Sequence, residues 1–128
     1  MIGKLFAAAL VLAAAPAVPA DTGVGGSWRV EGKVASFAFS LNCAFEPDGD
    51  HFGGVCADAS TSDPTIKPGR SHALTAGIER GGAVSWTYRS SFLFQAFDVT
   101  FNGVRHGDRI TGTITVPGRQ GAFVATRP

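Results

Sequence analysis

Apolar and polar residues alternate from residue 26 to the end of the chain, in short stretches that stop at glycine-marked turns. The clearest stretch places Phe37, Phe39, Leu41, Cys43 and Phe45 at every second position, with small or polar residues between them. A period of two residues is that of a half-buried strand, whereas a helix repeats about every 3.6 residues. The pattern therefore predicts strands and indicates no helix.

Eight stretches of this kind follow one another, and most of the connections between them are short. The predicted strands are Ser27–Gly32, Ser36–Glu46, Gly53–Ala59, Ser71–Glu79, Ala83–Arg89, Phe92–Asn102, Asp108–Val116 and Gly121–Arg127. The one long connection is Ser60–Arg70. Short connections join neighbouring antiparallel strands. The chain is therefore predicted to be all-β, folded as an eight-stranded antiparallel up-and-down barrel.

One stretch breaks the alternation. Phe92 and Phe94 are out of phase with Phe97 and Phe101. A β-bulge near Ala96 would return them to the interior, because one extra residue reverses the alternation. The alternative is that Phe92 and Phe94 point outward, which would indicate a surface for a partner.

The first twenty residues resemble a secretory signal peptide and are not expected to join the fold. Lys4 precedes an apolar run over Phe6–Ala15, and small residues with two prolines then lead to Ala20. This layout predicts cleavage after Ala20 and one mature domain of residues 21–128, in the periplasm or secreted. A buried N-terminal helix is the alternative. The apolar run of roughly ten residues is too short to span a bilayer.

Two cysteines, Cys43 and Cys56, support export. An even number of cysteines in a secreted domain favours a disulfide. A hairpin loop over Pro47–Phe52 would place the two residues opposite each other on neighbouring strands, on the same face. A redox role would need a CxxC motif or an activating cation, and the sequence has neither.

Charge argues against one class of partner. Removing Lys4 from the eleven Lys and Arg leaves ten, against ten Asp and Glu. Electrostatics supplies most of the binding to nucleic acid, so a mature chain of zero net charge is not expected to bind it.

Several short motifs resemble those of avidin-type and lipocalin-type meander barrels. They are Gly26-Ser27-Trp28, Asp48-Gly49, Leu74-Thr75-Ala76-Gly77, Val84-Ser85-Trp86, Phe101-Asn102-Gly103 and Ile110-Thr111-Gly112-Thr113. The resemblance implies an eight-stranded barrel that binds a small molecule at one open end. It does not imply biotin, because avidin-type sites use more tryptophans than Trp28 and Trp86. The Gly-Trp and Cys-Cys layout is also similar to that of small periplasmic metalloprotease inhibitors.

The predicted topology separates the charges. Alternate loops of an up-and-down barrel gather at the same end, and one end collects Lys33, Lys67, Arg70, Arg89 and Arg119 against Asp63. The other end collects Glu46, Asp48, Asp50, Glu79 and Asp108, partly balanced by Arg80 and Arg105. Clustered cations at an opening concentrate anions. We expect a ligand site there, with Trp28, Trp86 and Tyr88 lining it and Lys67, Arg70, Arg89 and Arg119 at its rim. The alternative is a barrel filled by its own phenylalanines, since eight strands enclose either side chains or one small ligand.

Two polar residues fall on inward positions near the same opening. If Cys43 faces Cys56, Leu41 lies opposite Asp58, and His72 shares the inward face of Leu74. This placement allows Asp58 and His72 to meet, as part of the ligand site or as a hydrogen-bonded pair that satisfies burial; the alternative is that both lie at frayed strand ends in water. No serine or cysteine nucleophile is identifiable beside them, so no catalytic residue is assigned.

No cofactor or metal is expected. His51 and His106 lie in loops with Asp48, Asp50 and Asp108, but without the ligand count of a known metal loop. Phosphate-loop, dinucleotide, nucleophile-elbow and zinc-protease motifs do not occur in the sequence.

The sequence thus predicts a monomeric, exported, non-enzymatic protein that binds a small anionic or amphiphilic ligand at the basic end of its barrel. The alternative is a protein-binding module, such as an inhibitor of a periplasmic protease or another exported enzyme, that uses Ser60–Arg70 or Asp21–Gly26. An enzyme of the barrel-cyclase or isomerase kind, using Asp58 and His72, is the third possibility. An internal cavity favours the first, and a filled barrel with an exposed apolar patch favours the second.

Overall fold

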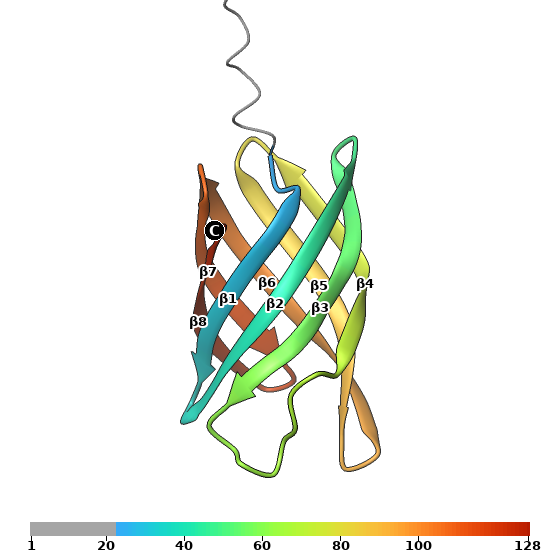
Figure 1. Ribbon diagram of the computed structural model, residues 1–128, viewed down its shortest axis with the longest axis vertical. Helices are drawn as coiled ribbons and strands as arrows, with labels where there is room; N and C mark the ends of the chain where they lie inside the picture. Colours follow the sequence, from blue (N-terminus) through green and yellow to red (C-terminus); the bar gives the residue numbers. More distant parts are fainter. Residues whose placement is uncertain (1–22) are drawn as a thin grey trace, which may run out of the picture.

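The chain folds into a closed barrel of eight antiparallel strands (Figure 1). The structure is a computed structural model that describes residues 23–128, so the predicted signal peptide lies outside the described residues. The strands are β1 (Gly26–Val34), β2 (Phe37–Asp48), β3 (His51–Thr61), β4 (Ser71–Arg80), β5 (Ala83–Phe92), β6 (Gln95–His106), β7 (Arg109–Val116) and β8 (Arg119–Thr126). No helix in this part of the chain is long and apolar enough to cross a bilayer.

Each strand pairs with the next one in the sequence, and β1 closes the barrel by pairing with β8. The predicted fold is therefore confirmed, with strand ends that differ by a few residues. The short turns explain most of this order, because a strand followed by a two-residue turn pairs with its successor; β3 and β4 are joined by a longer connection.

The predicted bulge near Ala96 is wrong. β5 and β6 pair in unbroken register from Ala83 opposite Val104 to Phe92 opposite Gln95. Phe92 therefore ends β5, and Leu93 and Phe94 form a two-residue turn. Both turn residues have positive φ, 51° and 66°. That is the backbone of a type I′ hairpin turn, which usually carries Asn-Gly, so two large apolar residues concealed the turn from the sequence.

The disulfide is confirmed. Cys43 and Cys56 are opposite each other in the β2–β3 register, and they are bonded. Both lie in the hydrophobic core, with exposed fractions of 2% and 0%.

Replacing both cysteines with alanine should lower the free energy of unfolding by about 3 kcal/mol, because the bridge restricts a short loop of the unfolded chain. Urea unfolding of the double variant and of the parent protein, each with and without reductant, measures this loss. Reductant should destabilise only the parent. Equal stability of the parent in both conditions would contradict the prediction.

Aromatic side chains fill one half of the barrel. The Trp86 ring stacks on Phe101 with centroids 4.7 Å apart, and Phe45 and Phe123 contact it at 5.0 and 5.4 Å. Because Trp86 and Phe101 are fully buried, this half holds side chains and not a ligand.

The barrel is closed at the end where the β2–β3, β4–β5 and β6–β7 turns gather; we call this the sealed end (Figure 1). Residues 23–25 cross it. The Arg127 guanidinium donates to the carbonyl oxygens of Gly23 and Gly25 at 2.8 and 2.7 Å, and lies 4.5 Å above the Trp28 ring. The Trp28 indole donates to the Val24 carbonyl oxygen at 2.8 Å. These contacts tie the segment across the opening.

Candidate functional site

The opposite end of the barrel is open; we call it the mouth. The β1–β2, β3–β4, β5–β6 and β7–β8 connections surround it (Figure 1). A cavity of about 790 Å³ opens there. Pockets for small molecules commonly measure roughly 300–1,000 Å³. The barrel is therefore filled in one half and hollow in the other.

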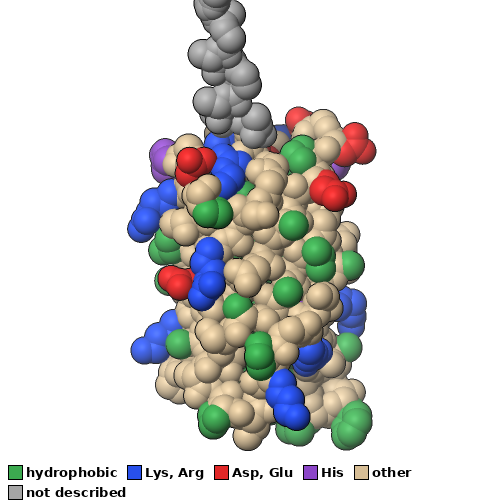
Figure 2. All heavy atoms as spheres, viewed as in Figure 1, with side chains coloured by type: hydrophobic (Ala, Val, Ile, Leu, Met, Phe, Trp, Pro, Cys, Tyr) green, Lys and Arg blue, Asp and Glu red, His purple; other side chains and the backbone are tan. Residues whose placement is uncertain are grey.

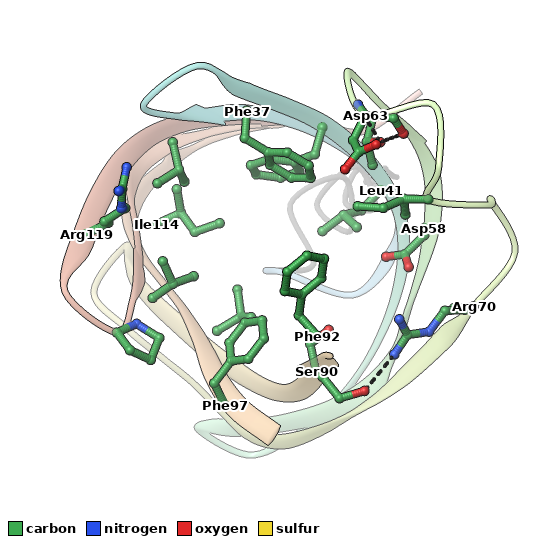
Figure 3. A pocket seen from close by; sticks show the side chains of 18 of the residues that line it. Phe37, Leu41, Asp58, Asp63, Arg70, Ser90, Phe92, Phe97, Ile114 and Arg119 are labelled. Carbon is green, nitrogen blue, oxygen red and sulfur yellow. Dashed lines mark hydrogen bonds between the residues drawn. The ribbon is translucent and has the colours of Figure 1, made fainter. Parts of the chain in front are cut away.

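The wall of the cavity is mainly apolar. Side chains from β1, β2, β6 and β7 form most of it: Val34, Leu41, Phe97, Val99, Ile114 and Val116. Phe37 and Phe92 stand on facing sides of the opening with their rings directed into it (Figure 3). Such a lining favours the hydrocarbon part of a ligand, because binding removes apolar surface of both the ligand and the wall from contact with water.

One part of the wall is polar, and it contains the contact between Asp58 and His72 that the sequence allowed. His72 Nε2 lies 3.1 Å from Asp58 Oδ1, and the His72 ring stacks on Tyr88 with centroids 4.7 Å apart. Asp58 is opposite Leu41, as the cysteine pairing required. Asp58 and Tyr88 line the cavity, whereas His72 lies behind them and is only 6% exposed.

Burial raises the pKa of the Tyr88 phenol well above its ordinary value. The Asp58 carboxylate raises it further, and Arg70 opposes both effects. Tyr88 therefore stays neutral at physiological pH. Its hydroxyl is available to a ligand both as a donor and as an acceptor.

Two arginines stand at the opening. Arg70 lies on the same side as Asp58, and Arg119 lies on the other side of the mouth (Figure 3). Arg70 Nη2 donates to Ser91 Oγ at 3.4 Å. The Arg70 carbonyl also accepts from the Asp58 amide at 2.8 Å, which ties the long β3–β4 connection to the wall. Both guanidiniums are exposed and can meet an anion at the rim.

The structure brings four of the nine predicted ligand residues to the cavity: Asp58, Arg70, Tyr88 and Arg119. Lys67 is exposed on the β3–β4 connection without lining the cavity. Arg89 points outward and lies 3.5 Å from Asp98 on β6. Its neighbour Tyr88 points inward, so the strand alternation already indicated that Arg89 points outward.

The two tryptophans predicted to line the site do not reach it. Trp28 packs under Arg127 at the sealed end, and Trp86 lies within the filled half. Phe97, Ile114 and Val116 line the cavity instead. They are inward residues at the mouth ends of their strands, and position along the strand was the signal that could have identified them.

Within residues 23–128 no three His, Cys, Asp or Glu side chains gather closely enough to hold a metal ion.

Comparison of the chain with models of protein families, with curated proteins and with solved structures finds no match.

Proposed function

We propose that this protein is an exported, non-enzymatic binding protein for a small anionic amphiphile. The observation that supports this best is the division of the cavity, which is apolar in its depth and has Arg70 and Arg119 at its opening. A hydrocarbon tail suits the first region and an anionic head group suits the second.

The Asp58 carboxylate determines which end of the amphiphile enters the cavity. It lies in the cavity wall with its side chain 16% exposed, so an anion placed deep in the cavity would be repelled. At the rim an anionic head group meets guanidiniums, which bind carboxylate or phosphate through paired hydrogen bonds. The amphiphile therefore enters tail first. Because the other end is sealed, it leaves by the same opening.

Replacing Arg70 and Arg119 with glutamine should weaken binding of dodecanoate about tenfold or more, since charge-assisted hydrogen bonds contribute roughly 1.5–3 kcal/mol each. Titration calorimetry measures the affinity. Dodecanol, which has the same tail without the charge, should bind the variant and the parent equally.

Arg89→Gln is the matched control, because it removes one cation that is near the mouth but faces away from the cavity and toward Asp98. Its affinity for dodecanoate should stay within about twofold of the parent. An equal loss in the Arg89 and Arg119 single variants would contradict a rim site. Absence of dodecanoate and dodecanol binding to the parent would contradict the proposed function.

A protein-binding role is the second candidate. The β3–β4 connection favours it, because Lys67, Pro68 and Gly69 are exposed beside the mouth. Native mass spectrometry of the protein expressed with export separates the two. A bound small molecule that leaves on denaturation supports the first candidate, whereas a stable complex with a second exported protein supports this one.

A further inference from the structure

The β5–β6 turn exposes three consecutive large apolar side chains. Phe92, Leu93 and Phe94 have exposed fractions of 56%, 75% and 104%. The hairpin projects at the mouth end of the barrel (Figure 1). Single exposed apolar residues are common on soluble proteins, but a contiguous group at a projecting tip indicates a contact surface.

The backbone of this turn gives a second, independent reason. Leu93 and Phe94 both have positive φ, where side chains other than glycine and asparagine are disfavoured. Folding alone would favour Asn-Gly at these two positions. The turn instead holds residues that are unfavourable both for the backbone and for exposure to water. An outlier of this kind points to a function for the side chains themselves.

Cations lie around the mouth, and one of them, Arg70, contacts Ser91 beside the turn. Lys33, Lys67, Arg70 and Arg119 lie at or near the mouth, and among residues 23–128 no ion pair involves Lys33, Lys67 or Arg119. On the face that Figure 2 shows, the lower third carries Lys and Arg as its only charged side chains, with apolar side chains below them at the extremity. The acidic groups near the mouth are less available, and the exposed Asp98 on β6 lies 3.5 Å from Arg89. Asp58 is recessed in the cavity wall, and Asp63 Oδ1 accepts from Thr65 N and Oγ1 at 2.9 and 2.7 Å.

We propose that the mouth docks on the surface of an anionic lipid bilayer. Leu93 and Phe94 would enter the boundary between head groups and acyl chains, Phe92 would lie beside them at the opening of the cavity, and Lys and Arg of the mouth would contact the lipid phosphates. The order along the barrel axis, with apolar groups outermost and cations behind them, matches the order of acyl chains and anionic head groups in a membrane.

The same features disfavour a second copy of the chain as the occupant. Two mouths placed face to face would bring the same unpaired cations together, and like charges repel. The turn is also a projecting tip of three side chains, which is too small for a stable protein interface of roughly 800 Å² per partner. A lipid surface accepts a wedge of this size without complementary shape.

Docking would place the opening of the cavity against the lipid. An amphiphile could then pass between bilayer and cavity with its tail shielded from water. This consequence rests on the proposed function, whereas the docking itself does not.

Sedimentation with lipid vesicles tests the docking. The probes are vesicles of phosphatidylcholine alone and of phosphatidylcholine mixed with phosphatidylglycerol, and the variant is Leu93→Asn with Phe94→Gly. We expect the full chain to bind the anionic vesicles at least tenfold more tightly than the neutral ones. The double variant should lose at least tenfold of the anionic binding, although its turn sequence is the preferred one, and its thermal unfolding temperature should equal or exceed that of the parent.

Two controls complete the test. Val104→Asn removes an apolar side chain that is 47% exposed on the barrel wall near the sealed end, and it should bind anionic vesicles like the parent. Arg119→Gln should weaken binding to anionic vesicles and leave binding to neutral vesicles unchanged. All variants keep residues 1–22, so a difference between them and the parent arises in the barrel.

Equal binding of the parent and the turn variant, or no preference of the parent for anionic vesicles, would overturn the proposal. So would a dimer of the parent that the turn variant abolishes, because the turn would then contact a second copy. Leu93 lines the edge of the cavity whereas Phe94 does not, so the single variant Phe94→Gly serves to separate the two proposals. Its dodecanoate binding in vesicle-free solution is expected to match the parent while its binding to anionic vesicles falls, so failure of docking and failure of the ligand site can be distinguished.

Discussion

Replacing Phe101 with alanine should lower the free energy of unfolding by about 3–5 kcal/mol, the usual cost of deleting a fully buried phenylalanine. Phe101 is 0% exposed and lies at the centre of the aromatic cluster. Its ring centroid is 4.7 Å from Trp86, 5.2 Å from Phe123, 5.9 Å from Tyr88 and 6.4 Å from Phe39. No single neighbour can fill the space, because each is held by its own strand. Urea unfolding measures the loss.

The same substitution should deepen the cavity. Tyr88 and Phe39 line the cavity, whereas Trp86 and Phe123 do not, so Phe101 lies at the floor between the hollow and filled halves. A variant that remains folded should therefore shift its preference toward carboxylates with longer tails. Val104→Ala on the same strand is the control. Val104 is half-exposed, and its loss should cost less than about 0.5 kcal/mol. Equal destabilisation by both substitutions would show that Phe101 does not support the core.

The alternation of residues predicted the closed barrel because it is a local property repeated eight times. The position of a turn and the direction of a side chain both follow from the residues close to them in the sequence. Short connections then leave each strand little choice of partner. The contact of Asp58 with His72 was predictable for the same reason. The disulfide fixes the β2–β3 register, and the alternation then sets the face of every residue nearby.

The division into a filled and a hollow half was not predictable in this way. It depends on which inward side chains meet in the aromatic cluster around Trp86 and Phe101, and on the closure of one end by residues 23–25, to which Arg127 bonds across 104 residues of sequence. The alternation of side chains correctly placed Trp28 and Trp86 in the interior, but it does not say where along the barrel axis an inward side chain lies. The tryptophans therefore belong to the sealed end and the filled half, and smaller apolar residues line the mouth.

The β5–β6 turn escaped prediction for a different reason. Turn signals are preferences of the backbone, and Leu93-Phe94 has none of them. The register of the flanking strands imposes positive φ on both residues. Local preference and structure disagree at this turn, whose residues we propose contact lipid.

Replacing Gly112 with alanine should be among the most damaging single changes in the barrel wall, with a cost of about 3 kcal/mol or more. Gly112 of β7 is opposite Gly103 of β6. A Cβ at Gly112 would overlap the backbone carbonyl oxygen of Asn102 and lie 2.5 Å from the Gly103 Cα. These are backbone atoms of a paired strand, so relief requires the two strands to separate. Thermal unfolding and the yield of folded protein measure the effect.

Gly53→Ala is the matched control, because it makes the same chemical change in a strand of the same barrel. A Cβ at Gly53 would have nothing within 4 Å, and its backbone does not require glycine. Alanine there restricts the unfolded chain, so stability should be unchanged or rise by up to about 1 kcal/mol. Comparing the two variants distinguishes the general effect of replacing a glycine from the effect of a side chain placed where two strands approach closely. Similar stabilities of the two variants would mean that β6 and β7 do not meet as closely as the structure places them, and that the barrel can close without this glycine pair.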